Sequence, residues 1–182
     1  MSELELLARE AATKYGLDPA LVCALCEVES GWNPRAVRYE PDYKWLWGIK
    51  EPLTTINGLN IVSFDLKNGP VLIDIIPSTP ETELALQKTS WGLMQIMGAT
   101  ARERGFTGWL TELCDPAVNL EWGCWHLRWM IDHNNAYGLP DYRITPEDLA
   151  AAWNWGSRMV VDGKYANEDY VKRAVKAMVN YE

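Results

Sequence analysis

The sequence lacks the features that mark membrane-spanning and nucleic-acid-binding proteins. Its longest apolar runs, such as residues 71–76, are far shorter than the roughly 20 residues that a membrane-spanning helix needs. No basic segment followed by an apolar one opens the chain, so we expect neither a transmembrane segment nor a signal peptide. With 25 acidic and 17 basic residues the net charge is -8, whereas proteins that neutralise phosphates are usually basic. Nucleic acid is therefore not an expected partner.

Phenylalanine is scarce, with two residues, whereas tryptophan is abundant, with ten. Phe or Leu could fill a core without an indole N–H that needs an acceptor, so we expect some indoles to face a ligand. Helical spacing predicts that one stripe is buried, made of Val118, Trp122, Trp125 and Trp129. Six other indoles remain candidates for ligand contact: Trp32, Trp45, Trp47, Trp91, Trp153 and Trp155.

The residues that hold metals or form disulfides are also few: Cys23, Cys26, Cys114, Cys124, His126 and His133. Cys23 and Cys26 lie three residues apart in a helical pattern, which disfavours a bridge between them. A zinc site would need a second close cysteine pair or nearby histidines. We interpret the cysteines as reduced thiols, with a Cys114–Cys124 disulfide as the alternative, and the histidines as packing or surface residues. No metal and no cofactor is expected.

The capping pattern predicts a mainly α, α+β fold. Helix start signals, a capping residue followed by proline or acidic residues, occur at Ser2, Asp18, Thr79, Asp115, Thr145 and Asn167. A further short helix is expected to end at Arg104 and Gly105. Within an insertion over about residues 39–88, two β-prone runs, 59–64 and 71–76, flank Asn68-Gly69-Pro70. We therefore predict about seven helices and a small β-hairpin around residues 45–78, in a single domain over residues 1–182.

Glu29 is the strongest candidate for an acid/base residue. On a helical wheel it lies beside Val22 and Leu25, at the edge of an apolar face, whereas Glu27 points away and is interpreted as solvated surface. The apolar edge and the negative end of the helix dipole should both raise the pKa of Glu29, which suits a general acid near neutral pH. The alternative is a structural role, in a hydrogen bond to the turn at 33–35 or in an arginine pair.

Four short motifs follow one another along the chain: Val28-Glu29-Ser30-Gly31-Trp32-Asn33-Pro34, Gly92-Leu93-Met94-Gln95-Ile96, Ala152-Trp153-Asn154-Trp155-Gly156 and Tyr170-Val171. In sequence and order they resemble the motifs of the soluble lytic transglycosylase family, whose lysozyme-like domains cleave peptidoglycan glycan strands. The resemblance covers about residues 11–175. Segments at 38–41, 114–116 and 122–124 are similar to phage-borne, endolysin-like members of the family.

This resemblance implies an enzyme that cleaves the β-1,4 bond between N-acetylmuramic acid and N-acetylglucosamine. It implies that Glu29 protonates the glycosidic oxygen and then acts as base on the C6 hydroxyl of the muramic acid, which closes a 1,6-anhydro ring. The matching motifs further imply a set of substrate-binding candidates: Ser30, Met94, Gln95, Trp153, Asn154 and Tyr170. Tyr39 joins them because the long segment after the first motif brings it close to the expected cleft. Each of four residues also has a structural alternative: Ser30 could cap a helix end, Gln95 and Asn154 could hydrogen-bond buried backbone groups, and Tyr170 could pack in the core.

The chain departs from the family pattern at Trp153, where the family usually has tyrosine. A hydroxyl that could hydrogen-bond the glutamate is therefore missing, and Tyr170 or Tyr39 could take over its orienting role. Because of this departure, a non-catalytic peptidoglycan-binding virion module is the competing class of function. The retention of Glu29, Gln95 and Asn154 argues against that class.

The long segment between the first two motifs is the second departure, and it brings Glu40 towards the expected cleft. A second carboxylate there could activate water and give a muramidase resembling goose-type lysozyme. The alternative is that Glu40 pairs with Arg35 or Arg38. We expect a monomer that acts on peptidoglycan at the periplasmic cell wall. It would reach the wall from the host cytoplasm through a holin, as part of a virion, or through a secretion machine.

Overall fold

The computed structural model describes residues 1–48, 54–56, 59–61, 78–133, 144–156, 160–161 and 164–182. Within these ranges the helices are α1 (Glu3–Lys14), α2 (Pro19–Ser30), α3 (Pro80–Gln87), α4 (Gly98–Glu103), α5 (Pro116–Asp132), α7 (Pro146–Trp155) and α8 (Glu168–Met178), with a 3-10 helix, η2 (Leu110–Cys114). The mainly helical α+β class is confirmed. None of the helices in the described ranges has the length and apolarity needed to cross a bilayer.

The strands are short and antiparallel. β1 (Val37–Tyr39), β4 (Thr89–Trp91) and β5 (Ile96–Met97) form a sheet in the order β1-β4-β5. β2 (Thr54–Ile56) pairs with β3 (Leu59–Ile61), and β6 (Val160–Val161) pairs with β7 (Lys164–Tyr165). The three-stranded sheet was not predicted, because runs of two or three residues are too short to show alternation.

The helix starts follow the capping signals in the sequence. The side chain of Ser2 caps α1, and Asp18 caps α2 ahead of a proline at the first helical position. Thr145 and Asp148 form a reciprocal capping box at the start of α7. α2 ends at Gly31, whose φ of 59° lies in the left-handed region that favours glycine. Local chemistry therefore determines where these helices begin and end.

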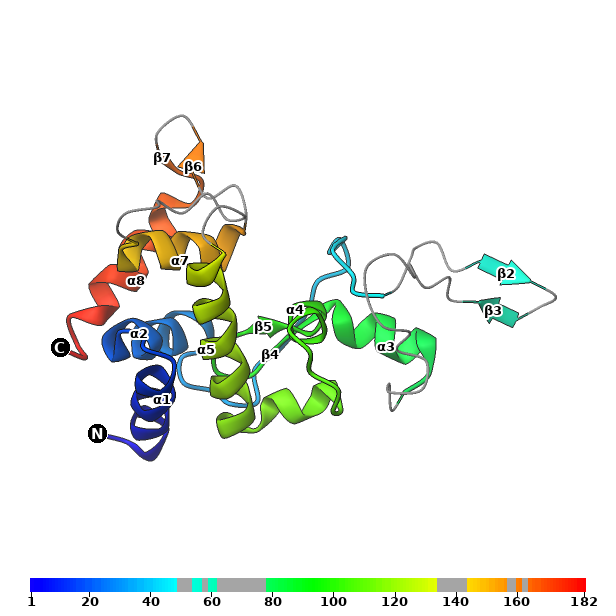
Figure 1. Cartoon of the computed structure of the whole chain (residues 1–182), viewed down its shortest axis with the longest axis horizontal. Coiled ribbons are helices and arrows are strands. Elements are labelled where there is room, and N and C mark those ends of the chain that lie inside the picture. The colour runs from blue at the N-terminus through cyan, green and yellow to red at the C-terminus, as the bar shows by residue number, and fades with distance from the viewer. Residues whose placement is uncertain (49–53, 57–58, 62–77, 134–143, 157–159, 162–163) are drawn as a thin grey trace.

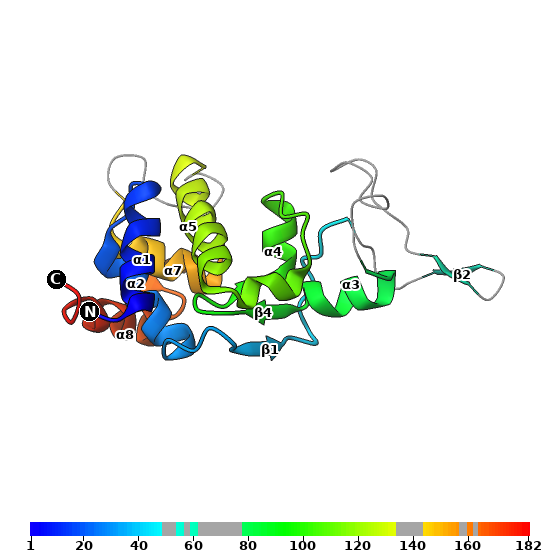
Figure 2. The ribbon, with the colours of Figure 1, turned by 90° about the horizontal axis from the view of Figure 1, so that it is seen from below.

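Two hydrophobic clusters form the core. The larger joins α1, α2, α5, α7 and α8, and the smaller is formed by Trp91, Ile96, Ala101, Phe106, Leu110 and Leu113. Two perpendicular views show α1, α2, α7 and α8 on one side of α5, and α4, β4 and α3 on the other (Figure 1 and Figure 2). Trp153 of α7 packs against both clusters. It therefore lies at the junction of the two halves.

The side of α5 that faces the core is not the predicted tryptophan stripe. Its buried residues are Asn119, Leu120, Gly123, Cys124, Leu127 and Met130, whereas Val118, Trp122, Trp125 and Trp129 are only half-buried. A Cβ on Gly123 would lie 2.3 Å from the sulfur of Met94, so a larger residue at this position would require the Met94 side chain to move. The small residues thus face the closely packed centre, and the indoles flank it.

The insertion contains a hairpin within the range predicted for it, formed by β2 and β3. β3 begins at Leu59 as expected, and its partner is β2, which the sequence did not mark as a strand. The second predicted run, residues 71–76, and the Asn68-Gly69-Pro70 turn lie outside the described residues.

The four cysteines are free thiols. Cys23, Cys26 and Cys124 are buried, and burial raises the pKa of each thiol. Cys114 and Cys124 are not bridged, so the alternative of a disulfide between them is not realised.

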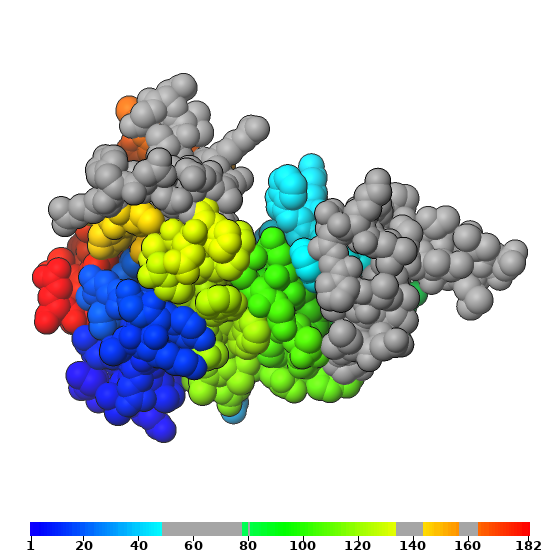
Figure 3. Space-filling model, in the orientation of Figure 1, coloured from blue at the N-terminus to red at the C-terminus, as the bar shows by residue number. Residues whose placement is uncertain are grey.

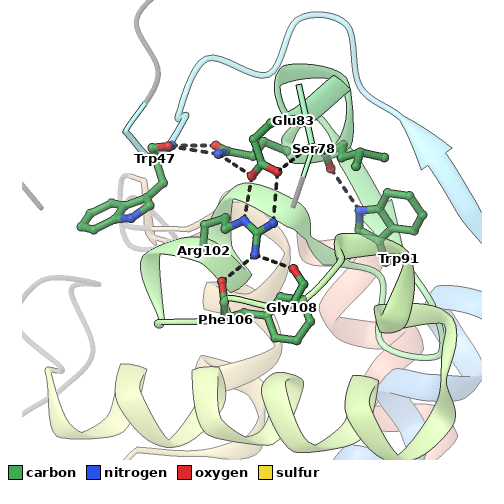
Figure 4. A network of polar contacts seen from close by, with 9 residues as sticks. Trp47, Ser78, Glu83, Trp91, Arg102, Phe106 and Gly108 are labelled. Carbon is green, nitrogen blue, oxygen red and sulfur yellow. Dashed lines mark hydrogen bonds and ion pairs between the residues drawn. The ribbon is translucent and has the colours of Figure 1, made fainter. Parts of the chain in front are cut away.

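A buried ion pair fixes the insertion to the smaller half of the molecule (Figure 4). The side chains of Arg102 and Glu83 are each 1% exposed and share two hydrogen bonds, of 2.7 and 3.0 Å. Arg102 also donates to two backbone carbonyls of the loop at 106–108. Gln87 donates to Glu83 and bonds both the N–H and the carbonyl of Trp47. The network therefore ties the start of the insertion to α3 and α4.

Candidate active site

A cavity of about 370 Å³ opens at the junction of the two halves. Its walls come from α2, β1 and the loop after it, β4, β5, α4, α5 and α7. In the space-filling view the surface is hollowed between the yellow end of α5 and the cyan segment that follows β1 (Figure 3). Five residues expected from the sequence line the cavity: Glu29, Glu40, Gln95, Trp153 and Asn154.

Glu29 lies in the last turn of α2, half-buried in the cavity wall. Burial raises its pKa above the ordinary value, because loss of water penalises the charged form. Side-chain hydrogen bonds from Tyr170 and Trp153, and the nearby charges of Arg38 and Arg173, lower the pKa and only partly offset this effect. The predicted direction of the shift is therefore confirmed. Such a carboxyl retains its proton to a higher pH than a solvated one.

Two donors from different helices hold the Glu29 carboxyl. The hydroxyl of Tyr170, on α8, donates to its Oε1 at 2.6 Å, and burial raises the tyrosine pKa so that the hydroxyl stays protonated. Trp153 supplies the second hydrogen bond, and its only polar donor is the indole N–H. Trp153 therefore supplies a hydrogen-bond donor to Glu29 at the position where the family usually has tyrosine. Tyr39 is 57% exposed on β1 and does not line the cavity.

Gln95 is held in a strained turn between β4 and β5. It is a non-glycine residue with a φ of 52°, and such outliers persist only where the surroundings enforce them. Its Nε2 donates to the carbonyls of Ala36 and Gly92, at 3.0 and 2.9 Å, and its Oε1 accepts from Ser90 at 2.9 Å. The alternative role for Gln95, hydrogen bonding to backbone groups, is therefore present, although the side chain also lines the cavity.

Asn119 holds the same turn from α5, a role that no pattern in the sequence predicted. It is fully buried, accepts the N–H of Met94 at 2.8 Å, and donates to the carbonyls of Trp91 and Leu113. Gly92 has a φ of 66°, and a Cβ there would lie 2.3 Å from the Leu113 carbonyl. The motif glycine is therefore required both by backbone conformation and by close packing.

Glu40 lines the same cavity as Glu29 and also forms an ion pair with Arg38. Both possibilities raised for Glu40 are therefore present together: it stands near the candidate acid, and it is engaged by an arginine. Arg38, which lines the cavity as well, lowers the pKa of Glu29 through its charge. The sequence identified Arg38 only as a partner for Glu40.

The remaining candidates lie at the edge of the cavity or away from it. The hydroxyl of Ser30 donates to the Cys26 carbonyl of its own helix at 3.0 Å, and Ser30 does not line the cavity. Met94 is completely buried in the larger cluster, so it packs in the core beneath the motif at residues 92–96 and does not line the cavity. Asn154 is exposed at the cavity and accepts a hydrogen bond from Asn167.

Two residues interpreted as surface or packing have more specific surroundings. Glu27 accepts a hydrogen bond of 2.6 Å from the hydroxyl of Tyr181, so it is not simply solvated. His126 of α5 lines the cavity and packs its ring against Trp153, with the ring centroids 5.6 Å apart. No pattern in the sequence separates His126 from the other half-buried residues of α5.

The comparisons with known proteins identify the family. Residues 6–175 match the model of the transglycosylase SLT domain, which spans all four motifs. Searches of curated proteins and of solved structures gave no match. Among the described residues, no group of three or more His, Cys, Asp or Glu is placed to hold a metal ion. Since the family match covers nearly the whole chain, the protein belongs to the transglycosylase SLT domain family.

Proposed function

We propose that the protein cleaves the β-1,4 bond between N-acetylmuramic acid and N-acetylglucosamine, with Glu29 as the single acid/base and a 1,6-anhydro product. Members of the family are lytic transglycosylases that act on peptidoglycan. The observation that carries the finer proposal is the environment of Glu29. It is half-buried in a cavity wall, has a raised pKa and is held by Tyr170 and Trp153.

The reaction needs one carboxyl that gives and then recovers a proton. Protonated Glu29 transfers its proton to the glycosidic oxygen as the bond to C1 breaks. The resulting carboxylate takes the proton of the C6 hydroxyl, and O6 forms the new bond to C1. No water is consumed, and Glu29 ends protonated again. Hydrogen bonds from Tyr170 and Trp153 stabilise the carboxylate that exists between the two proton transfers.

Hydrolysis with Glu40 as a second carboxylate is the other candidate, because Glu40 lines the same cavity. Its ion pair with Arg38 supports the transglycosylase outcome. In that ion pair the guanidinium of Arg38 already occupies a side of the Glu40 carboxylate and competes there with a water molecule.

Mass spectrometry of the muropeptides released from purified peptidoglycan tests the proposal. We expect wild-type protein to release products ending in 1,6-anhydro-muramic acid, Glu29→Gln to release none while staying folded, and Glu40→Gln to leave the product unchanged. Products heavier by one water, lost in Glu40→Gln, would instead establish a muramidase. Glycan binding without any product from the wild type would establish a non-catalytic binding module.

We also propose that the protein is a phage-borne lysin that acts at the periplasmic wall after release by a holin or as part of a virion. The similarity of segments 38–41, 114–116 and 122–124 to phage-borne members supports this origin. An acidic protein gains no attraction to an anionic cell surface, so added protein should lyse Gram-negative cells only after their outer membrane is permeabilised. Lysis of untreated cells would contradict the proposal.

A further inference from the structure

We propose that Asn167 is a positioning residue for the cleavage reaction. It orients the side-chain amide of Asn154 so that Nδ2, rather than Oδ1, is left to donate a hydrogen bond to the bound glycan. The inference rests on the proposed function, since it requires a glycan in the cavity. Asn154 is exposed and lines this cavity, whereas Asn167 lies outside the cavity lining and outside the four motifs.

The orientation of the Asn167 amide follows from its position as the capping residue of α8. Its Oδ1 accepts a hydrogen bond from the backbone N–H of Tyr170, with 3.3 Å between the two atoms. A backbone N–H can only donate, so the atom of the Asn167 amide that faces it must be the oxygen. The other end of the amide, Nδ2, is therefore the group that meets Asn154.

The orientation of the Asn154 amide follows in turn. Nδ2 of Asn167 can only donate, so the atom of Asn154 that it meets must be the acceptor, Oδ1. Nδ2 of Asn154 forms no hydrogen bond within the part of the chain that the structure describes. Since the oxygen is occupied from outside the cavity lining, Asn154 meets a ligand as a hydrogen-bond donor. Acetamido carbonyls, which every sugar of the glycan carries, are acceptors of matching chemistry.

Asn167 also connects the third motif to the fourth. It binds the side chain of Asn154 and the backbone N–H of Tyr170, and the hydroxyl of the same tyrosine donates to Glu29 at 2.6 Å. The two helices that carry these groups, α7 and α8, share the larger hydrophobic cluster. A substrate-binding amide that is already oriented loses less conformational entropy when the glycan binds, so the contact should lower KM.

The test separates capping from positioning, because threonine and aspartate can both cap a helix. The threonine hydroxyl ends one bond short of the position of Nδ2, and an ionised aspartate cannot donate. For cleavage of purified peptidoglycan, we expect Asn167→Thr and Asn167→Asp to raise KM about three- to tenfold with little change in kcat. Aspartate should have the larger effect, because it accepts from Nδ2 of Asn154 and turns Oδ1 towards the ligand. Unchanged KM values in both variants would overturn the inference.

A double-mutant cycle shows whether Asn167 acts through Asn154. We expect Asn154→Ala alone to raise KM, and Asn167→Thr to add nothing further in the Asn154→Ala background. If Asn167→Thr raised KM equally in both backgrounds, the residue would act through the fold of α8, and the inference would be overturned. Asp115→Thr is the matched control, since it exchanges the capping residue of α5 outside the cavity lining and should leave KM unchanged.

A second measurement does not depend on the folding of an Asn167 variant. In ¹⁵N-labelled Glu29→Gln protein, which should bind the sugar without cleaving it, the side-chain amide signals of Asn154 are assigned by their loss in Asn154→Ala. We expect these signals to shift when a chitin tetrasaccharide is added. Asn154 signals unchanged by saturating sugar would overturn the inference.

The two proposals fail in different ways. If the wild type releases no muropeptides and the tetrasaccharide does not bind, the proposed function fails. If the wild type is active and binds the sugar but Asn167→Thr and Asn167→Asp behave like it, only the inference about Asn167 fails.

Discussion

Replacement of Tyr170 by phenylalanine tests most directly how the site sets the chemistry of Glu29. The substitution removes one hydroxyl, which donates to Oε1 of Glu29 at 2.6 Å, and leaves the buried ring in place. A hydrogen bond to a charged group contributes about 1.5–3 kcal/mol. At 1.36 kcal/mol for each pKa unit, loss of this bond should raise the pKa of Glu29 by about one to two units. The direction is upward because the Tyr170 bond lowers the pKa in the intact site.

The expected result is a shift in the pH profile of peptidoglycan cleavage. The high-pH limb of kcat/KM reports loss of the proton from Glu29 in the free enzyme, so it should move to higher pH by about one to two units. The maximal rate should fall, because the carboxylate formed during the reaction has lost a donor. The rate of turbidity loss of a purified peptidoglycan suspension, measured from pH 4 to 9, provides the profile.

Tyr181→Phe is a matched control in the turn that follows the same helix, α8. Its hydroxyl donates to Glu27, also in the last turns of α2, at the same 2.6 Å, and neither residue lines the cavity. We expect a comparable decrease in the free energy of unfolding in the two variants, and a shifted pH profile only in Tyr170→Phe. An unshifted limb in Tyr170→Phe, or an equal shift in both variants, would refute the reasoning that Tyr170 tunes Glu29.

Three further predictions concern stability. Arg102→Met leaves the Glu83 carboxylate buried without its arginine partner and should lower the free energy of unfolding by about 3–5 kcal/mol in urea titrations. A loss below about 1 kcal/mol would mean that water reaches the ion pair and would contradict this prediction. Gly123→Ala places a methyl group against the Met94 sulfur and should cost about 1–3 kcal/mol by the same assay, unless the flexible thioether moves aside. His126 has a folded pKa of about 3 and an ordinary unfolded value near 6.5, so below pH 6.5 the unfolded chain binds a proton that the folded one does not. Stability should therefore fall by about 1.4 kcal/mol for each pH unit as the pH decreases through this window, and thermal melts of His126→Phe should lack this component.

The sequence by itself determined the features that depend on neighbours along the chain. Helix starts at residues such as Ser2, Asp18 and Thr145 are set by hydrogen bonds that span two or three residues, so they could be located without a structure. The placement of Glu29 at the edge of an apolar face follows from the helical repeat alone, and so does the direction of its pKa shift. The motifs identified the family because their order along the chain is itself sequence information.

Only the tertiary structure decided which groups surround Glu29. Tyr170 lies 141 residues away along the chain, and no local pattern reports that its hydroxyl reaches the carboxyl. The donor role of Trp153 and the cavity position of His126 likewise depend on how α5 and α7 pack against α2. The buried face of α5 was mispredicted for the same reason, because close helix contact favours the small Gly123 over the large indoles beside it. Hydrophobic periodicity predicts that a face is buried, whereas the shape and chemistry of its partners arise only when distant segments meet.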